Sequence, residues 1–212
     1  MSLKGKKILI TAGPTWVAID QVRVISNLAS GETGFILADK FKKLGAKVTL
    51  LLGPGNFCGL QRSVKIIRFK YFTQLKQLLT VELKKEKYSA IIHAAAVSDY
   101  QVKGGDRNKI SSNLKNLKIN LIPTEKLIDS FKNYGAGLFS VGFKFEPTVT
   151  DNQLIKKAKA LLNKADLNLV VANSNKNMAY RAYILDRTNK YGPFLSKTKM
   201  ADYLSELIKN QL

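Results

Sequence analysis

The sequence has almost no cysteine or histidine. Cys58 and His93 are the single examples of these residue types among 212 residues. One cysteine excludes a disulfide framework within the chain and a cysteine-based zinc cluster, and one histidine excludes a histidine-rich metal site. Cys58 has no histidine or aspartate arrangement near it in the sequence, and we interpret it as incidental. The scarcity of cysteine is typical of a reducing compartment, so we expect a cytoplasmic protein.

Long hydrophobic runs are also missing. Hydrophobic residues make up 45% of the chain, but no apolar run approaches the roughly 18 residues that a membrane span needs. The first residues lead directly into the short apolar segment Ile8–Thr11, which is too short for the core of a signal peptide and has no small-residue cleavage pattern. We therefore expect no membrane partner.

Acidic residues are scarce relative to basic ones. The chain has 35 lysines and arginines against 15 aspartates and glutamates, which gives a formal net charge of +20. Such a charge favours anionic partners: nucleic acid, an acidic membrane surface or phosphorylated small molecules. The lysines are spread along the whole chain, which argues against a nucleic-acid-binding tail and leaves solvated surface lysines as the plain alternative.

The hydrophobic pattern predicts strands that alternate with helices. This alternation predicts one α/β domain over residues 1–212, built on a Rossmann-like parallel sheet with flanking helices. Two further segments, Ala182–Leu185 and Phe194–Leu195, predict an antiparallel hairpin at one edge of the sheet. The expected strands are Lys7–Thr11, Val48–Leu52, Val64–Phe69, Ala90–Val97, Leu117–Ile122, Gly137–Phe143 and Leu169–Ala172, and the expected helices are Phe35–Phe41, Thr73–Lys85, Thr124–Phe131, Gln153–Lys164 and Thr198–Leu212.

Two glycine-containing stretches flank an unusually long segment near the N-terminus. Gly13–Thr15 and Ser30–Gly34 suit a phosphate cradle, because glycines let backbone amides approach a ligand and a helix N-terminus attracts anions. Both are equally compatible with ordinary turns, and neither matches a usual nucleotide-binding fingerprint. The segment Ile19–Asn27 between them either carries substrate-binding groups, such as Arg23 and Asn27, or forms an arm at a subunit contact.

Polar loops at three strand ends are expected to converge, because ligands of parallel α/β sheets bind at the carboxyl ends of the strands. These loops follow Thr11, Val97 and Phe143. Asp99 in the second loop either accepts hydrogen bonds from a ligand or caps a turn. His93 lies within an apolar strand, and we favour a core histidine over a catalytic base.

Lysines cluster after Asp99 and on one predicted helix. Lys103, Arg107 and Lys109 occupy a single loop, where a cation can stabilise charge on phosphate oxygens. On the helix, helical spacing puts Lys156 with Lys159 on one face and Lys157 with Lys164 on another, so only part of the set can reach one ligand. The sequence shows these four helical lysines at 156, 157, 159 and 164.

A family resemblance rests on stretches that cover almost the whole chain. In order they are Ile10–Thr15, Ile19–Asp20, Val22–Arg23, Ile25–Asn27, Ser30–Gly31, Gly34, Gly45–Leu50, Gly53–Pro54, Ala95–Tyr100, Lys109–Ile110, Val141–Phe143 and Val171–Asn173. Together they resemble the phosphopantothenoylcysteine synthetase family of coenzyme A biosynthesis. In many bacteria this domain follows a flavin-dependent decarboxylase. Because the first strand begins within a few residues of Met1, the stand-alone form is expected.

The resemblance implies a ligase that joins 4′-phosphopantothenate to L-cysteine through an acyl-cytidylate, with CTP as co-substrate, Mg²⁺ on the triphosphate and a homodimeric assembly. Gly13, Ser30 and Gly31 would hold phosphates, and Ala95, Asp99 and Phe143 would shape the nucleotide pocket. Asn27 would orient the acyl-nucleotide, and Lys109 would stabilise charge as pyrophosphate leaves. Arg23 would bind substrate, and Lys159 and Lys164 are further candidate nucleotide ligands. The family's dimer contact would include Asp20–Ala29.

The chain departs from the family pattern at several of these positions. Ser111-Ser112 stands where many relatives have further lysines, so Lys103 or Arg107 would replace them. Glu32-Thr33 stands where Lys-Met is common, and Lys144-Phe145 where Ala-Ala is common.

Two other functions are compatible with part of the sequence. A basic Rossmann-like nucleic-acid-binding module explains the charge but not the glycine-rich loops, so nucleic acid is not the expected partner. An NAD(P)-dependent short-chain dehydrogenase is disfavoured, because the chain lacks G-x-G-x-x-G and a Tyr-x-x-x-Lys pair.

Overall fold

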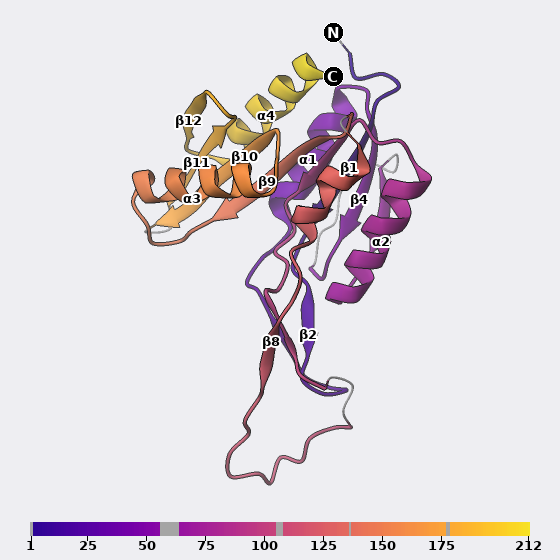
Figure 1. The fold of residues 1–212 in the computed structure, drawn as a ribbon, viewed down its shortest axis with the longest axis vertical. Helices are drawn as coiled ribbons and strands as arrows, with labels where there is room; N and C mark the ends of the chain where they lie inside the picture. The colour runs from indigo at the N-terminus through magenta and orange to yellow at the C-terminus, as the bar shows by residue number, and fades with distance from the viewer. Residues whose placement is uncertain (1, 56–63, 105–107, 136, 177–178) are drawn as a thin grey trace.

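An eight-stranded sheet forms the centre of the computed structural model, which describes residues 2–55, 64–104, 108–135, 137–176 and 179–212. The strands lie in the order β12-β11-β10-β9-β6-β1-β4-β5 (Figure 1). Neighbours from β10 to β5 pair in parallel, whereas β11 and β12 pair antiparallel at one edge. The predicted Rossmann-like sheet with an edge hairpin is confirmed. The strands are β1 (Lys7–Ala12), β4 (Lys47–Leu52), β5 (Lys65–Arg68), β6 (Ala90–His93), β9 (Phe139–Phe145), β10 (Leu169–Lys176), β11 (Ala179–Leu185) and β12 (Lys190–Phe194).

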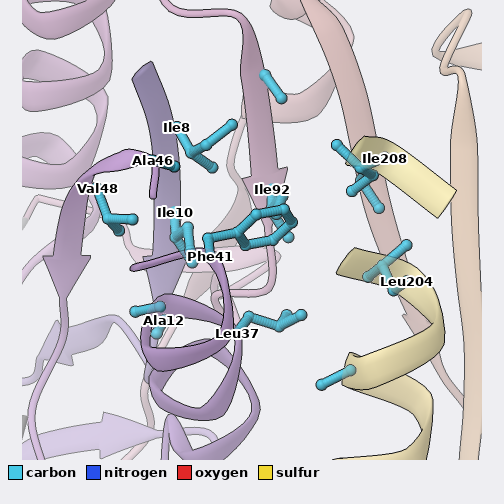
Figure 2. Packing of buried hydrophobic residues seen from close by; sticks show 14 of the residues in the cluster. Ile8, Ile10, Ala12, Leu37, Phe41, Ala46, Val48, Ile92, Leu204 and Ile208 are labelled. Atoms are coloured by element: carbon cyan, nitrogen blue, oxygen red, sulfur yellow. The ribbon is translucent and has the colours of Figure 1, made fainter. Parts of the chain in front are cut away.

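Helices cover both faces of the sheet, so each face has its own apolar core. On one face, α1 (Glu32–Lys43) and α4 (Lys197–Gln211) pack against the central strands, with Phe41 and Leu204 among the fully buried side chains (Figure 2). The other face carries α2 (Phe72–Lys85), the 3₁₀ helix η1 (Leu127–Tyr134) and α3 (Asp151–Lys164). Of the helices in the described ranges, none combines the length and apolarity needed to cross a membrane.

Helix α1 shows how the sequence pattern places an element. Its buried residues Gly34, Leu37, Ala38 and Phe41 recur at the three- and four-residue spacing of one helical face. Gly34 lies so close to β1 that a Cβ atom there would come within 2.4 Å of the Ala12 Cβ. The close contact fixes the N-terminal turn of α1 at the carboxyl end of β1.

Two short hairpins lie outside the sheet and extend away from it (Figure 1). One pairs β2 (Trp16–Ala18) with β3 (Val24–Ser26), and the other pairs β7 (Tyr100–Val102) with β8 (Leu121–Pro123). We call the described residues of 16–26 and 100–123 the arm. Several large apolar side chains of the arm and of the segment after it are exposed, including Val22 at 66% and Leu28, which is fully exposed at 109%. The segment Ile19–Asn27 forms part of the arm, and its place at a subunit contact stays a prediction.

Three predicted elements differ from the structure. The strand predicted over Leu117–Ile122 is wrong, because only Leu121–Pro123 is extended and it pairs with β7 in the arm. The strand predicted over Ala90–Val97 ends at His93, and beyond it only an isolated bridge pairs Ala96 with Pro14. The helix predicted over Thr124–Phe131 is instead the 3₁₀ helix η1.

Candidate active site

A cavity of about 920 Å³ lies at the carboxyl ends of the parallel strands. Its wall includes Gly13 after β1, Ala94–Val97 after β6 and Phe143–Phe145 at the end of β9. The expectation that these three regions converge is therefore confirmed. The volume is within the range of cavities that hold cofactors and small substrates.

Hydrogen bonds join the first two of these regions. The Ala95 backbone N–H donates to Thr11 Oγ1 at 3.2 Å, and Thr11 Oγ1 lies 2.9 Å from His93 Nδ1. The Thr11 hydroxyl thus hydrogen-bonds both the Ala95 amide and the His93 ring. The small-residue segment after β6 is thereby held against the end of β1.

His93 is a core histidine, as we favoured from the sequence. It is 7% exposed, and burial lowers its pKa to about 4. A neutral imidazole therefore lines the cavity across the physiological pH range.

The glycines of the two predicted phosphate loops take backbone shapes that favour glycine. Gly13 has a φ of +80° and Gly31, the N-cap of α1, has a φ of +83°. Gly31 offers no side-chain cap to the helix, while Ser30 Oγ accepts from the Glu32 N–H at 3.3 Å. The N-terminal turn of α1 therefore reaches the cavity with backbone amides that suit an anion.

Most of the predicted site residues lie on the cavity wall. Asn27 is held at its edge, because its Nδ2 donates to the Ala96 carbonyl at 3.0 Å. Asp99 pairs with Lys126, which also lines the cavity. The predicted residues brought together are Gly13, Asn27, Ser30, Gly31, Ala95, Asp99, Phe143 and Lys164.

The lysines of α3 divide between the cavity and solvent. Lys157 and Lys164 line the cavity, as their shared helical face allows, and Lys157 also pairs with Glu146 at 2.7 Å. Lys159 is exposed on another face of α3 and does not line the cavity. The structure therefore favours Lys157 over the predicted Lys159.

Arg23 and Lys109 belong to the arm and not to this cavity. The Arg23 guanidinium pairs with the buried Asp20 at 2.9 Å and donates to the Ile110 carbonyl at 3.2 Å. Burial opposes ionisation of Asp20, but hydrogen bonds from the backbone N–H groups of Val22, Ile110 and Arg23 outweigh it and lower its pKa. Lys109, the neighbour of Ile110, is exposed. This network ties the 109–110 segment to the first hairpin.

Lys103, one of the two residues expected to replace missing lysines, is not on the cavity wall. Lys103 lies on the arm, where its N–H donates to the Asn120 carbonyl at 2.9 Å. Arg107 lies outside the described residues, as does Cys58.

Sequence reasoning missed six polar side chains of the wall. They are Lys126, Asp129, Asn173, Asn175, Tyr180 and Lys197. Asn173 and Asn175 alternate at the end of β10, which is the one signal that predicts a shared polar face. Asn173 Oδ1 and the Tyr180 hydroxyl are buried and have no hydrogen-bond partner among the described residues. Each such group costs about 1–3 kcal/mol, which is typical of a site that awaits a ligand.

No cluster of three or more potential metal-ligating side chains occurs in the part of the chain that the structure describes. The carboxylates on the cavity wall are Glu32, Asp99 and Asp129. This donor set fits Mg²⁺ bound mainly by phosphate oxygens and water, with one carboxylate at most, because Mg²⁺ is commonly bound in that way at phosphate sites.

Comparisons with known proteins agree on one family. The sequence model described as "DNA/pantothenate metabolism flavoprotein C-terminal domain" matches residues 3–212. A relative from Thermococcus kodakarensis, named coenzyme A biosynthesis bifunctional protein CoaBC, is 37% identical over 175 residues, which cover 82% of this chain and 43% of the relative. The chain spans about half the length of the curated relatives it matches.

Solved structures show the same fold. The DNA/pantothenate metabolism flavoprotein from Streptococcus pneumoniae is 25% identical, with a TM-score of 0.87 over 98% of this chain and 100% of the other. A Cab2 mutant in complex with phosphopantothenate-cysteine has a TM-score of 0.77 at 18% identity, over 97% of this chain and 88% of the other. The chain therefore belongs to the family of the DNA/pantothenate metabolism flavoprotein C-terminal domain.

Proposed function

We propose that the protein is a phosphopantothenate–cysteine ligase of coenzyme A biosynthesis. It joins 4′-phosphopantothenate to L-cysteine and converts CTP to CMP and pyrophosphate. The observation that carries the proposal is the single cavity in which two glycine loops, the Ala94–Val97 segment and the Lys157 and Lys164 side chains meet. Both phosphorylated substrates need such a combination of backbone amides and cations.

The relatives support this proposal. The Thermococcus kodakarensis relative is named for coenzyme A biosynthesis, and a protein of the same fold was solved with phosphopantothenate-cysteine. The proposed reaction needs no cysteine or histidine nucleophile, because positioning and electrostatic stabilisation can carry both of its steps.

The proposed chemistry has two steps. A carboxylate oxygen of phosphopantothenate attacks the α-phosphorus of CTP. The bond between the α-phosphorus and the oxygen that bridges it to the β-phosphorus breaks, and pyrophosphate leaves. The cysteine amine then attacks the acyl carbon and loses a proton, and CMP leaves. Bound Mg²⁺ would neutralise phosphate charge in the first step, with Asp99 or Asp129 as its carboxylate ligand.

The predicted residues on the cavity wall have a place in this scheme. Gly13, after β1, and Ser30 and Gly31, at the N-terminal turn of α1, bind phosphates. Asn27, whose amide is fixed by Ala96, orients the acyl-nucleotide. The remaining proposed nucleotide contacts are Ala95, Asp99, Phe143 and Lys164, with Lys157 in place of Lys159.

We propose CTP as the preferred nucleotide because the site can read the edge of a pyrimidine. The small residues Ala94–Ala96 leave backbone groups open beside Phe143. A site that hydrogen-bonds one specific edge discriminates by up to roughly 10⁴-fold, since the wrong base leaves buried polar groups unpaired.

We also propose a homodimer built through the arm. Its exposed apolar side chains have no covering layer in the described chain, which is typical of an interaction surface. Arg23 and Lys109 lie on the arm and not on the wall of their own cavity, so a second copy that receives the arm would gain both cations at its site.

Pyrophosphate release tests the ligase proposal. The purified protein is incubated with CTP, Mg²⁺ and phosphopantothenate, with and without cysteine, and pyrophosphate is measured. We expect release that requires phosphopantothenate, and lower release when ATP, UTP or GTP replaces CTP. Release that is independent of phosphopantothenate would contradict the proposal, and faster release with ATP would remove the CTP preference alone.

A further inference from the structure

The N-terminal turns of two helices meet at one corner of the cavity. Glu32 is the first residue of α1 and Lys197 is the first residue of α4. Their side chains form an ion pair, and both line the cavity. Two helix N-termini at one corner create a site that attracts anions, and one of them carries a lysine.

The Glu32–Lys197 pair is open to solvent. The Lys197 side chain is 34% exposed and the Glu32 side chain is 48% exposed. Exposed ion pairs contribute little to stability, so this pair can part at little cost when a stronger anion arrives. A polyphosphate carries more charge than one carboxylate and would compete with Glu32 for Lys197.

The two unpartnered polar atoms lie on the wall at the same face of the sheet. Asn173 lies two residues after the buried Val171 on β10, so the two side chains share one face of the sheet. Tyr180 is the cross-strand partner of Asn175, which lies on that same face. Burial and the nearby Glu32 carboxylate raise the pKa of Tyr180, so its hydroxyl remains a neutral donor. Because the hydroxyl oxygen is buried, it reaches a ligand only when neighbouring side chains move.

We propose that Lys197 binds the β- and γ-phosphates of the nucleotide at this corner, and that Glu32 holds Lys197 in place until the phosphates replace it. Tyr180 supplies a second donor to the same anion once Glu32 moves. This assignment rests on the proposed use of a nucleoside triphosphate. It adds a cation from the C-terminal helix to the glycine loops already assigned to phosphates.

The two charges of the pair make opposite contributions to anion binding. Lys197→Gln removes a phosphate ligand, whereas Glu32→Gln removes a competing negative charge. A pair with a purely structural role would respond in the same direction to both changes, because either substitution breaks it.

The test measures binding of inorganic tripolyphosphate to the intact chain by calorimetry. We expect the dissociation constant to rise by about tenfold or more in Lys197→Gln and to fall in Glu32→Gln. Lys199→Gln, an exposed lysine two residues further on α4, is the matched control for charge and should change affinity less than about twofold. Tyr180→Phe should weaken binding without lowering the thermal midpoint, because it removes an unpartnered buried hydroxyl.

Equal losses in Lys197→Gln and Lys199→Gln would overturn the proposal, since they would show only non-specific attraction. Unchanged affinity in Lys197→Gln would overturn it as well, provided that the thermal midpoint shows a folded variant. Tripolyphosphate binding does not require ligase activity, so a chain that binds it through Lys197 but releases no pyrophosphate would contradict the ligase proposal and support this one.

Discussion

Single glycines decide how closely the elements approach at the cavity. Gly34 is the tightest example, because its helix packs directly on the last residue of β1. We expect Gly34→Ala to destabilise the protein by about 1–3 kcal/mol, since the added methyl would lie 2.4 Å from the Ala12 Cβ and α1 would have to shift. Urea unfolding measures the change.

The control for this substitution is Gly137→Ala. A Cβ atom at Gly137 meets nothing within 4 Å, so we expect little change in the free energy of unfolding. Equal losses in the two variants would show that the contact between Gly34 and Ala12 does not limit the packing of α1.

His93 links the stability of the site to pH. Its pKa is about 4 in the folded chain because of burial, and about 6.5 in an unfolded chain. Between these values the unfolded state binds more protons, so stability is fully present above pH 6.5 and is lost as the pH falls towards 4. We expect His93 to lower the free energy of unfolding by about 3 kcal/mol when the pH falls from 7 to 4.

The measurement compares urea unfolding of the wild type and His93→Gln from pH 7 to pH 4.5. The variant is expected to be less stable at pH 7 but to lose less stability on acidification, because the carboxylates are common to both proteins. Parallel losses in the two proteins would mean that His93 is not held neutral by the fold.

Residue types and spacing predicted the cavity wall better than they predicted which lysines reach it. Gly13 follows β1 and Phe143 lies near the end of β9, and the carboxyl ends of neighbouring parallel strands must meet. Lys159 was predicted where Lys157 lines the cavity, because the sequence gives the faces of α3 but not its rotation about the sheet. Lys197 comes from an element that is distant in sequence, so no local pattern could place it.

At the scale of elements, the sheet and its helices follow from the alternation of apolar segments. The arm does not. Leu117–Ile122 has the apolar residues of a strand, but Leu114 and Leu117 are about half exposed because no layer of the described chain covers them. The hydrophobic pattern predicts that the apolar side chains of a segment are covered. It does not predict whether the covering residues belong to the same chain or to a second one.

The arm predicts a specific result when two inactive variants are mixed. Asn27 lines the cavity, whereas Lys109 lies on the arm. We expect Asn27→Ala and Lys109→Gln each to lose most ligase activity as homodimers. If each arm serves the other subunit, then mixed dimers have one site with both native residues, and an equal mixture refolded or exchanged to equilibrium regains about a quarter of the wild-type activity.

Light scattering on the same samples checks the assembly. A dimer mass together with recovered activity supports the exchange of arms. A monomer mass would remove the homodimer proposal, and dimers without recovered activity would mean that Lys109 acts at the site of its own chain or not at all.

For the whole molecule, part of the positive charge that gives the +20 net value lies around the candidate active site. Lys126, Lys144, Lys157, Lys164 and Lys197 all line one cavity at the carboxyl end of the sheet. Five ammonium groups around one cavity suit two phosphorylated substrates better than the long surface of a nucleic acid. The central claim is therefore acyl-nucleotide chemistry within this cavity.

Isotope transfer tests that claim most directly. Phosphopantothenate labelled with ¹⁸O in its carboxylate is incubated with CTP, Mg²⁺, cysteine and the protein, and CMP is analysed by mass spectrometry. Because the attacking oxygen remains on the α-phosphorus when the amide forms, we predict that each CMP produced carries one ¹⁸O atom. Unlabelled CMP formed alongside the amide product, or label found in inorganic phosphate with CDP as the nucleotide product, would contradict the account.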